Sequence, residues 1–273
     1  MRRFWSIFFV FILGIILLLH KNGPITLAVS SPDFEQAYQT YIQSSSVYQT
    51  DFEKFVLARS QYLTFKSISS ESEAIAATKK MIFSRTDFVA NYLKALRIKL
   101  ALETNILDYQ ENLLYLQLDN ELSSLLNSKE VVTSAQDLKE LSKIEKDSGE
   151  KFKEIKKSAY KSLSLIIYHQ TLKETTDLRK QVDLLKTKLG EYAGLGNSDL
   201  SNAQKRFSQL DDQLRSLEKE VAENRKNFFS QVDGQADPER AYLTYKEQMS
   251  SLNMAILNLF PSFEEIIFLI KKT

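Results

Sequence analysis

Residues 200–228 of the chain read LSNAQKRFSQLDDQLRSLEKEVAENRKNF. One set of side chains recurs there at alternating steps of three and four residues, which is the spacing of a heptad repeat. The spacing predicts a helix whose continuous seam packs against a partner helix in a left-handed coiled coil. The seam consists of Leu200, Ala203, Phe207, Leu210, Leu214, Leu217, Val221, Asn224 and Phe228.

The preceding helix is the nearest partner for this seam. A capping signal at 134–137 and apolar residues recurring as far as Tyr192 predict a long helix, either continuous or broken near 147–150. Three glycines between 190 and 199 predict the turn that follows. Because a short connection makes antiparallel neighbours, positions whose numbers sum to about 390 are expected to face each other.

Two seam residues receive specific expectations from this register. Leu217 is expected to find its apolar contacts in Leu172 and the methyl group of Thr176. Asn224 is expected opposite residues 162–170, where a lone amide in an apolar seam would fix the register at some loss of stability.

The rest of the chain also follows a helical period. Gly and Pro are rare, at seven and four residues, which is typical of long helices joined by short turns. A turn near Ser67 predicts that the first two helices form an antiparallel hairpin with Arg85 close to Asp51. Helix starts are expected at 31–33, 70–73, 134–137 and 237–238, with a shorter Leu-rich helix over 104–130 and a kink or restart at Pro261.

The first residues form an export signal. Met1-Arg2-Arg3 precedes an apolar run over 4–19, so the positive charges stay in the cytoplasm and the remainder is translocated. Small residues at 26–30 fit cleavage by a signal peptidase, whereas Lys21 and the polar spacer fit a retained membrane anchor. Both readings remain open, and both place the bulk of the protein outside the cytoplasm, secreted or anchored to the membrane.

Composition limits the chemistry of the exported part. Without residues 1–28 the chain keeps 33 basic residues, having lost Arg2, Arg3 and Lys21, against 35 acidic ones, so its net charge of about −2 argues against nucleic-acid binding. There is no Cys, and His169 is its only His, which excludes thiolate and multi-His metal sites. We therefore assign no catalytic, cofactor-binding or metal-binding residues and expect no cofactor and no enzymatic activity.

The pattern as a whole predicts an all-α protein, an elongated antiparallel helical bundle of coiled-coil hairpins with five or six helices after the export segment. The expected divisions are 1–28, the signal peptide or anchor; 29–130, a helical hairpin plus the short third helix; and 131–273, a long coiled-coil hairpin plus the C-terminal helix.

The leading functional expectation is a non-enzymatic envelope scaffold, spacer or adaptor that acts through helix–helix contacts. Protein partners are expected, an oligomer is compatible with the seam, and an uncleaved N-terminal segment would add contact with the membrane. The alternative is a membrane-active, pore-forming type of protein that uses an apolar segment at 163–168 or 260–270. A binding module with a pocket between helices is a third class that the sequence leaves open.

Overall fold

The structure, a computed structural model, describes residues 31–103, 109–194, 200–234 and 237–272. The export segment and residues 195–199 of the expected turn therefore lie outside the described residues, while residues 190–194 belong to the helix that precedes the turn. Within these ranges the secondary structure is helical and no strand occurs, which confirms the all-α helical bundle. The helices are α2 (Pro32–Phe65), α3 (Ile68–Glu103), α4 (Tyr109–Ser134), α5 (Leu138–Gly194), α6 (Ser201–Gly234), α7 (Pro238–Leu257) and α8 (Phe260–Lys272).

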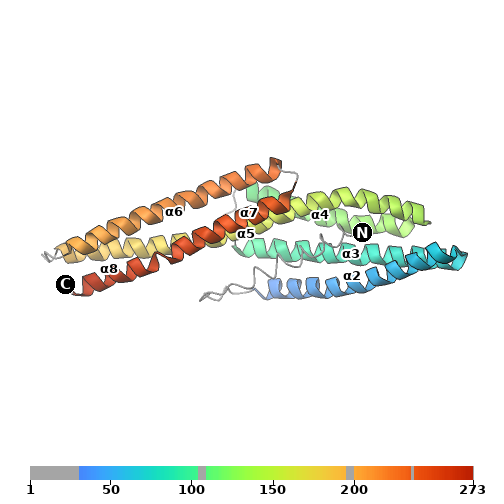
Figure 1. The fold of residues 1–273 in the computed structure, drawn as a ribbon, viewed down its shortest axis with the longest axis horizontal. Coiled ribbons are helices and arrows are strands. Elements are labelled where there is room, and N and C mark those ends of the chain that lie inside the picture. The colour runs from blue at the N-terminus through green and yellow to red at the C-terminus, as the bar shows by residue number, and fades with distance from the viewer. Residues whose placement is uncertain (1–30, 104–108, 195–199, 235–236, 273) are drawn as a thin grey trace.

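The bundle is elongated, and α5 runs through both of its halves (Figure 1). In one half α2, α3 and α4 accompany the N-terminal part of α5, and in the other α6, α7 and α8 accompany its C-terminal part. With 57 residues, α5 spans about 86 Å at about 1.5 Å per residue. The helix is continuous through 147–150, where Gly149 has open space around it.

The α2–α3 hairpin has a core of stacked aromatic rings. Ser31 caps α2 by accepting a hydrogen bond from the Phe34 amide at 3.2 Å. Tyr41, which is 1% exposed, packs on Phe88 at 5.2 Å and on Tyr92 at 5.5 Å between ring centroids. Tyr41 and Tyr48 of the first helix are thus used for packing between helices, since their rings stack on aromatic rings of α3.

Two details of this hairpin differ from the sequence expectation. The second helix begins at Ile68 rather than at 70–73, because Ser67 and Ser70 exchange hydrogen bonds between each side chain and the other's amide. Asp51 forms an ion pair with Lys80, with 3.4 Å between Oδ1 and Nζ, and not the expected pair with Arg85. Arg85 turns instead toward α5, where its Nη2 donates to Glu145 at 2.7 Å.

Other helix starts follow the predicted capping signals. Asp137 caps α5 by accepting from the Glu140 amide at 2.7 Å, and the Glu140 carboxylate accepts from the Gln136 amide at 2.7 Å. Asp237 caps α7 in the same way, with Pro238 as the first helical residue. The chain restarts as α8 at Phe260, next to Pro261, as predicted.

Candidate interaction seam of α6

The predicted seam residues lie along one face of α6 and are mostly buried against neighbouring helices. Phe207, Leu217 and Asn224 are half-buried. The buried members, each no more than 2% exposed, are Leu200, Ala203, Leu210, Leu214, Val221 and Phe228.

The seam packs against more than one helix. Its first half shares a core with Leu178, Val182, Leu185 and Leu189 of α5, but also with Ile256 of α7 and Ile266 and Ile270 of α8. Its second half shares a core with Ala241, Tyr245, Met249 and Leu252 of α7. At each level of the seam a C-terminal helix, α7 or α8, therefore joins α5 and α6 in a three-helix core. Heptad spacing in the sequence of α6 does not distinguish this core from a two-helix hairpin.

The expectation for Leu217 is wrong, because α7 also packs against this seam. Leu172 and Thr176 both lie exposed on α5, because the buried positions in that stretch are Thr171 and Thr175. Leu217 instead packs at the junction of the two cores just described, which include residues of α7.

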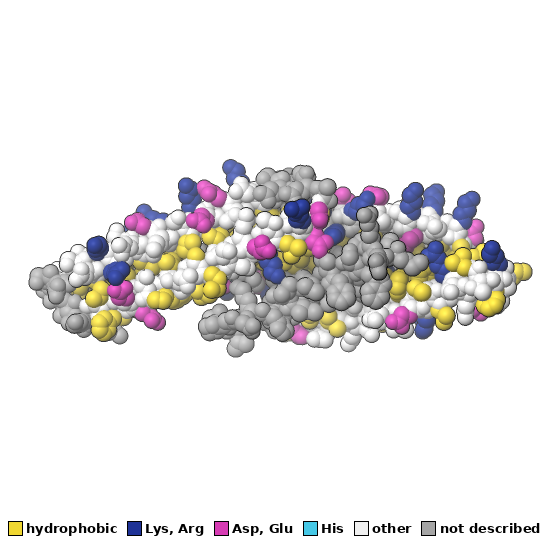
Figure 2. Space-filling model, viewed as in Figure 1, with side chains coloured by type: hydrophobic (Ala, Val, Ile, Leu, Met, Phe, Trp, Pro, Cys, Tyr) yellow, Lys and Arg dark blue, Asp and Glu magenta, His cyan; other side chains and the backbone are white. Residues whose placement is uncertain are grey.

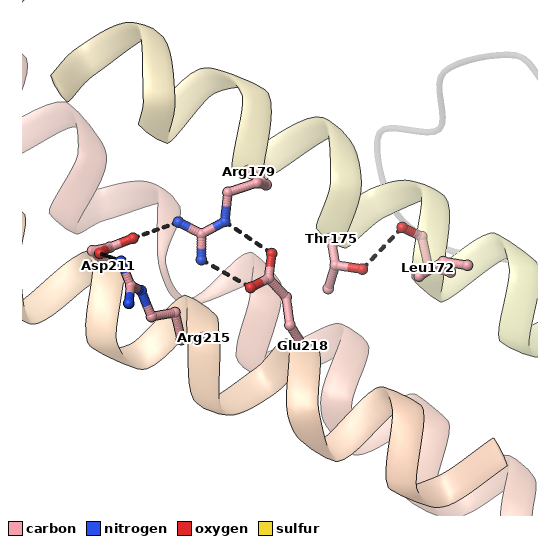
Figure 3. Close-up of polar contacts among 6 residues, drawn as sticks. All are labelled: Leu172, Thr175, Arg179, Asp211, Arg215 and Glu218. Carbon is pink, nitrogen blue, oxygen red and sulfur yellow. Dashed lines mark hydrogen bonds and ion pairs between the residues drawn. The ribbon is translucent and has the colours of Figure 1, made fainter. Parts of the chain in front are cut away.

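A charged network fixes the register of α5 on α6 (Figure 3). Arg179 Nε and Nη2 donate to the two carboxylate oxygens of Glu218, each at 2.9 Å, and its Nη1 donates to Asp211. Arg215 approaches the other Asp211 oxygen at 2.9 Å. The residue numbers sum to 390 for Arg179 with Asp211 and to 397 for Arg179 with Glu218, so the two helices are antiparallel, as predicted, and Arg179 lies between the two acids, close to the predicted register.

The network also changes the ionisation of its members. Hydrogen bonds from Arg179, chiefly to Glu218, raise the pKa of the guanidinium although burial opposes this. Burial alone would raise the pKa of Asp211, but hydrogen bonds from Arg179 and Arg215 outweigh it and lower that pKa. Both groups are therefore held in their charged forms, as a structural ion network requires.

The face of α5 at the centre of the molecule carries small hydroxyl side chains. Their hydroxyls donate to backbone carbonyls one turn earlier, as for Ser162 to Ser158 O at 2.8 Å and Thr175 to Thr171 O at 2.9 Å. Each of these hydroxyls reaches a carbonyl of its own helix, and Ser158 also contacts Glu121 of α4, so the face favours close packing. The buried members are Ser158, Ser162, Ser164, Thr171 and Thr175.

One carboxylate lies at the α4–α5 contact. Glu121 Oε1 accepts from Ser158 Oγ and from Gln117 Nε2, the latter at 3.1 Å. Its Oε2 is buried without a hydrogen-bond partner. Burial raises the pKa of Glu121, and the two hydrogen bonds only partly offset this.

The chemical inventory of the described residues is otherwise small. His169 is half-buried with its ring at 5.1 Å from that of Tyr168. Among the described residues, no group of His, Asp and Glu side chains could hold a metal ion. An open groove of about 390 Å³ lies along α4, lined by Asn120, Ser123, Ser124, Asn127, Ser128, Val131 and, from α5, Lys151.

The two apolar segments have different surroundings. In 163–168, Leu163, Leu165 and Ile166 are at most 2% exposed and belong to the core. In 260–270, Ile266 and Ile270 are buried, while Phe268 is 64% exposed. Among the described residues, 238–270 is the one stretch long and apolar enough to cross a membrane, and a core helix of a soluble protein would meet the same criterion.

Comparison with family models, with curated proteins and with solved structures found no match to this chain.

Proposed function

We propose that this chain is a non-enzymatic, exported scaffold or spacer that acts through coiled-coil contacts with protein partners. The continuous α5 is the observation that carries the proposal. One uninterrupted helix of about 86 Å supplies core residues to both halves of the bundle, so the two ends are held at a fixed separation. A rod of this kind suits a spacing or bridging role.

The hydrogen bonding of the polar side chains between the described helices supports a non-catalytic role. Buried polar groups such as Ser162 and Thr175 bond within their own helix, and the carboxylates of the Arg179 network are neutralised by guanidinium groups. Neither arrangement offers a nucleophile beside a base, which hydrolytic chemistry requires. Ser158 does donate to the Glu121 carboxylate, but its side chain is fully buried between α4 and α5, away from any substrate. Export follows from the charged start and the apolar run over 4–19.

Site-specific photo-crosslinking in cells tests the proposal. A photoreactive residue at Val47, which is 54% exposed on α2, or at Leu184, which is 68% exposed on α5, samples the two halves of the rod. We expect discrete protein adducts from at least one position, formed outside the cytoplasm. The same residue at fully buried Leu214 is the matched control and should give none. Absence of adducts from both exposed positions would refute a scaffold that acts through protein contacts.

The membrane-active alternative is retained for one segment. Residues 260–270 combine an apolar composition with an exposed Phe268. Residues 163–168, in contrast, supply buried side chains to the core. Release of a trapped dye from vesicles distinguishes the two functions. A scaffold leaves the vesicles sealed. A pore-forming protein releases the dye, and the substitution Phe268→Ser should reduce the extent of release.

A further inference from the structure

The turn between α2 and α3 is the most exposed apolar feature of the described chain. Leu63, Phe65 and Ile68 are 59%, 70% and 89% exposed. They cluster at the extreme end of the rod, where α2 gives way to α3 (Figure 1). Three large apolar side chains around one turn form a cluster, which distinguishes them from the exposed apolar side chains that stand singly elsewhere on the helices.

The turn has a defined geometry. Lys66 takes the left-handed conformation with φ 49°, and its amide donates to Tyr62 O at 2.9 Å. On the other side, Ser67 and Ser70 exchange hydrogen bonds of 3.0 and 3.2 Å between side chain and amide. Since both helix ends are capped, the neighbouring apolar side chains are presented from a fixed backbone.

The same end of the hairpin is basic. The basic character is confined to residues 54–70, because Glu53 precedes them, Glu71 and Glu73 follow them, and Lys80 further along α3 pairs with Asp51. Lys54, Arg59 and Lys66 are exposed, and no acidic residue occurs between positions 54 and 70. Figure 2 shows hydrophobic and basic side chains at this end of the molecule, with acidic side chains also present. The surface is therefore both apolar and complementary to anions.

We propose that this α2–α3 tip, defined as residues 59–68, inserts into the interface of a lipid bilayer that carries anionic headgroups. Apolar side chains that enter the acyl boundary, flanked by Lys and Arg that meet the headgroups, are the chemistry of interfacial binding. Three side chains on one turn present far less than the roughly 800 Å² that each partner contributes to a stable protein interface. A bilayer, in contrast, accepts side chains individually.

This inference does not depend on the scaffold role. The rod would gain a lipid contact at one end whether or not protein partners bind along its sides. It also differs from the membrane-active alternative, because insertion of a turn into the interface leaves the bilayer sealed and involves the end of the bundle that α8 does not reach (Figure 1).

The test places a single fluorophore in the full chain. Trp5 is the only Trp, so the variant Trp5→Phe with Phe65→Trp reports from the tip alone. The protein is mixed with phosphatidylcholine vesicles, which accommodate the N-terminal apolar run. Acceptor vesicles with brominated acyl chains are then added, either of phosphatidylcholine or of a phosphatidylglycerol mixture. We expect quenching by the anionic acceptors, weakened by added salt because screening reduces attraction to the headgroups.

A matched control separates the tip from general adhesion. Trp5→Phe with Leu184→Trp places the fluorophore at a similarly exposed apolar position in the other half of the rod, and it should not be quenched. Absence of quenching at position 65, or equal quenching at positions 65 and 184, overturns the proposal. The first result would mean that the tip does not enter the bilayer, and the second that the whole rod adheres to lipid without a specific role for the tip.

Two further variants assign the contributions. Ile68→Ser should weaken acceptor binding about tenfold or more, because burial of one large apolar side chain is worth at least that factor. Lys66→Asn removes a charge while tolerating the left-handed backbone, and should weaken binding to anionic acceptors about fivefold. Both positions are exposed, and Asn is favoured in the left-handed region, so circular dichroism should show no loss of melting temperature for either variant. Unchanged binding by Ile68→Ser would also contradict insertion.

Discussion

Removal of the Arg179 guanidinium tests the register of α5 on α6. Arg179→Met keeps the aliphatic packing and leaves Glu218 without its bidentate partner, while Asp211 keeps only Arg215. Arg179, Asp211 and Glu218 are 17–35% exposed, and Arg215 is 67% exposed, so solvent screens the interaction in part. Hydrogen bonds to charged groups contribute ~1.5–3 kcal/mol and exposed ion pairs ~0.2–1 kcal/mol. We therefore expect the free energy of unfolding to fall by about 1–3 kcal/mol.

Urea unfolding followed by circular dichroism measures this loss. The matched control is Lys180→Met, which removes an exposed pair with Asp177 one residue further along the same helix and should cost less than about 0.5 kcal/mol. In a double-mutant cycle, Arg179→Met and Glu218→Gln should show a coupling of about 0.5–1.5 kcal/mol. Equal effects of the two Met variants, or additive effects within the cycle, would show that the observed register is wrong.

Three other expectations follow from burial and backbone geometry. Leu214→Ala should destabilise the bundle by ~2–5 kcal/mol in urea unfolding because Leu214 is fully buried, whereas Leu184→Ala at an exposed site should change it by less than about 0.5 kcal/mol. Lys66→Gly should raise the melting temperature, with a gain of roughly 0.5–1 kcal/mol, because a left-handed backbone strains any residue with a Cβ. Glu121 has a raised pKa in the fold, so the folded state binds the proton more tightly and stability falls as pH rises above the ordinary value of 4.5. Glu121→Gln should remove this slope from a pH series of melting curves and stabilise the protein at neutral pH, and a steeper slope in the variant would contradict the assignment.

The local features of the fold could be predicted from the sequence because they depend on neighbours in the chain. The cap at Ser31, the first helical Pro238 and the restart beside Pro261 each follow from backbone donors that need a partner, or from a proline that cannot continue a helix. The α5–α6 register followed from a short turn together with the heptad phase, and the Arg179–Asp211 pair lies where that reasoning places it.

Contacts between distant elements were decided only by the tertiary structure. The seam of α6 identifies an apolar face, but an apolar face accepts one helix or two, and the docking of α7 and α8 determines what surrounds Leu217. Arg85 illustrates the same limit, because a guanidinium within reach of several carboxylates pairs with the one that packing brings nearest, here Glu145 of α5. The exposed tip at Phe65 became visible only when the fold buried or half-buried the other aromatic residues of the first helix and left this one in solvent. Periodicity thus specifies which side of a helix is apolar, whereas the choice among competing partners depends on the free energy of the whole packed bundle.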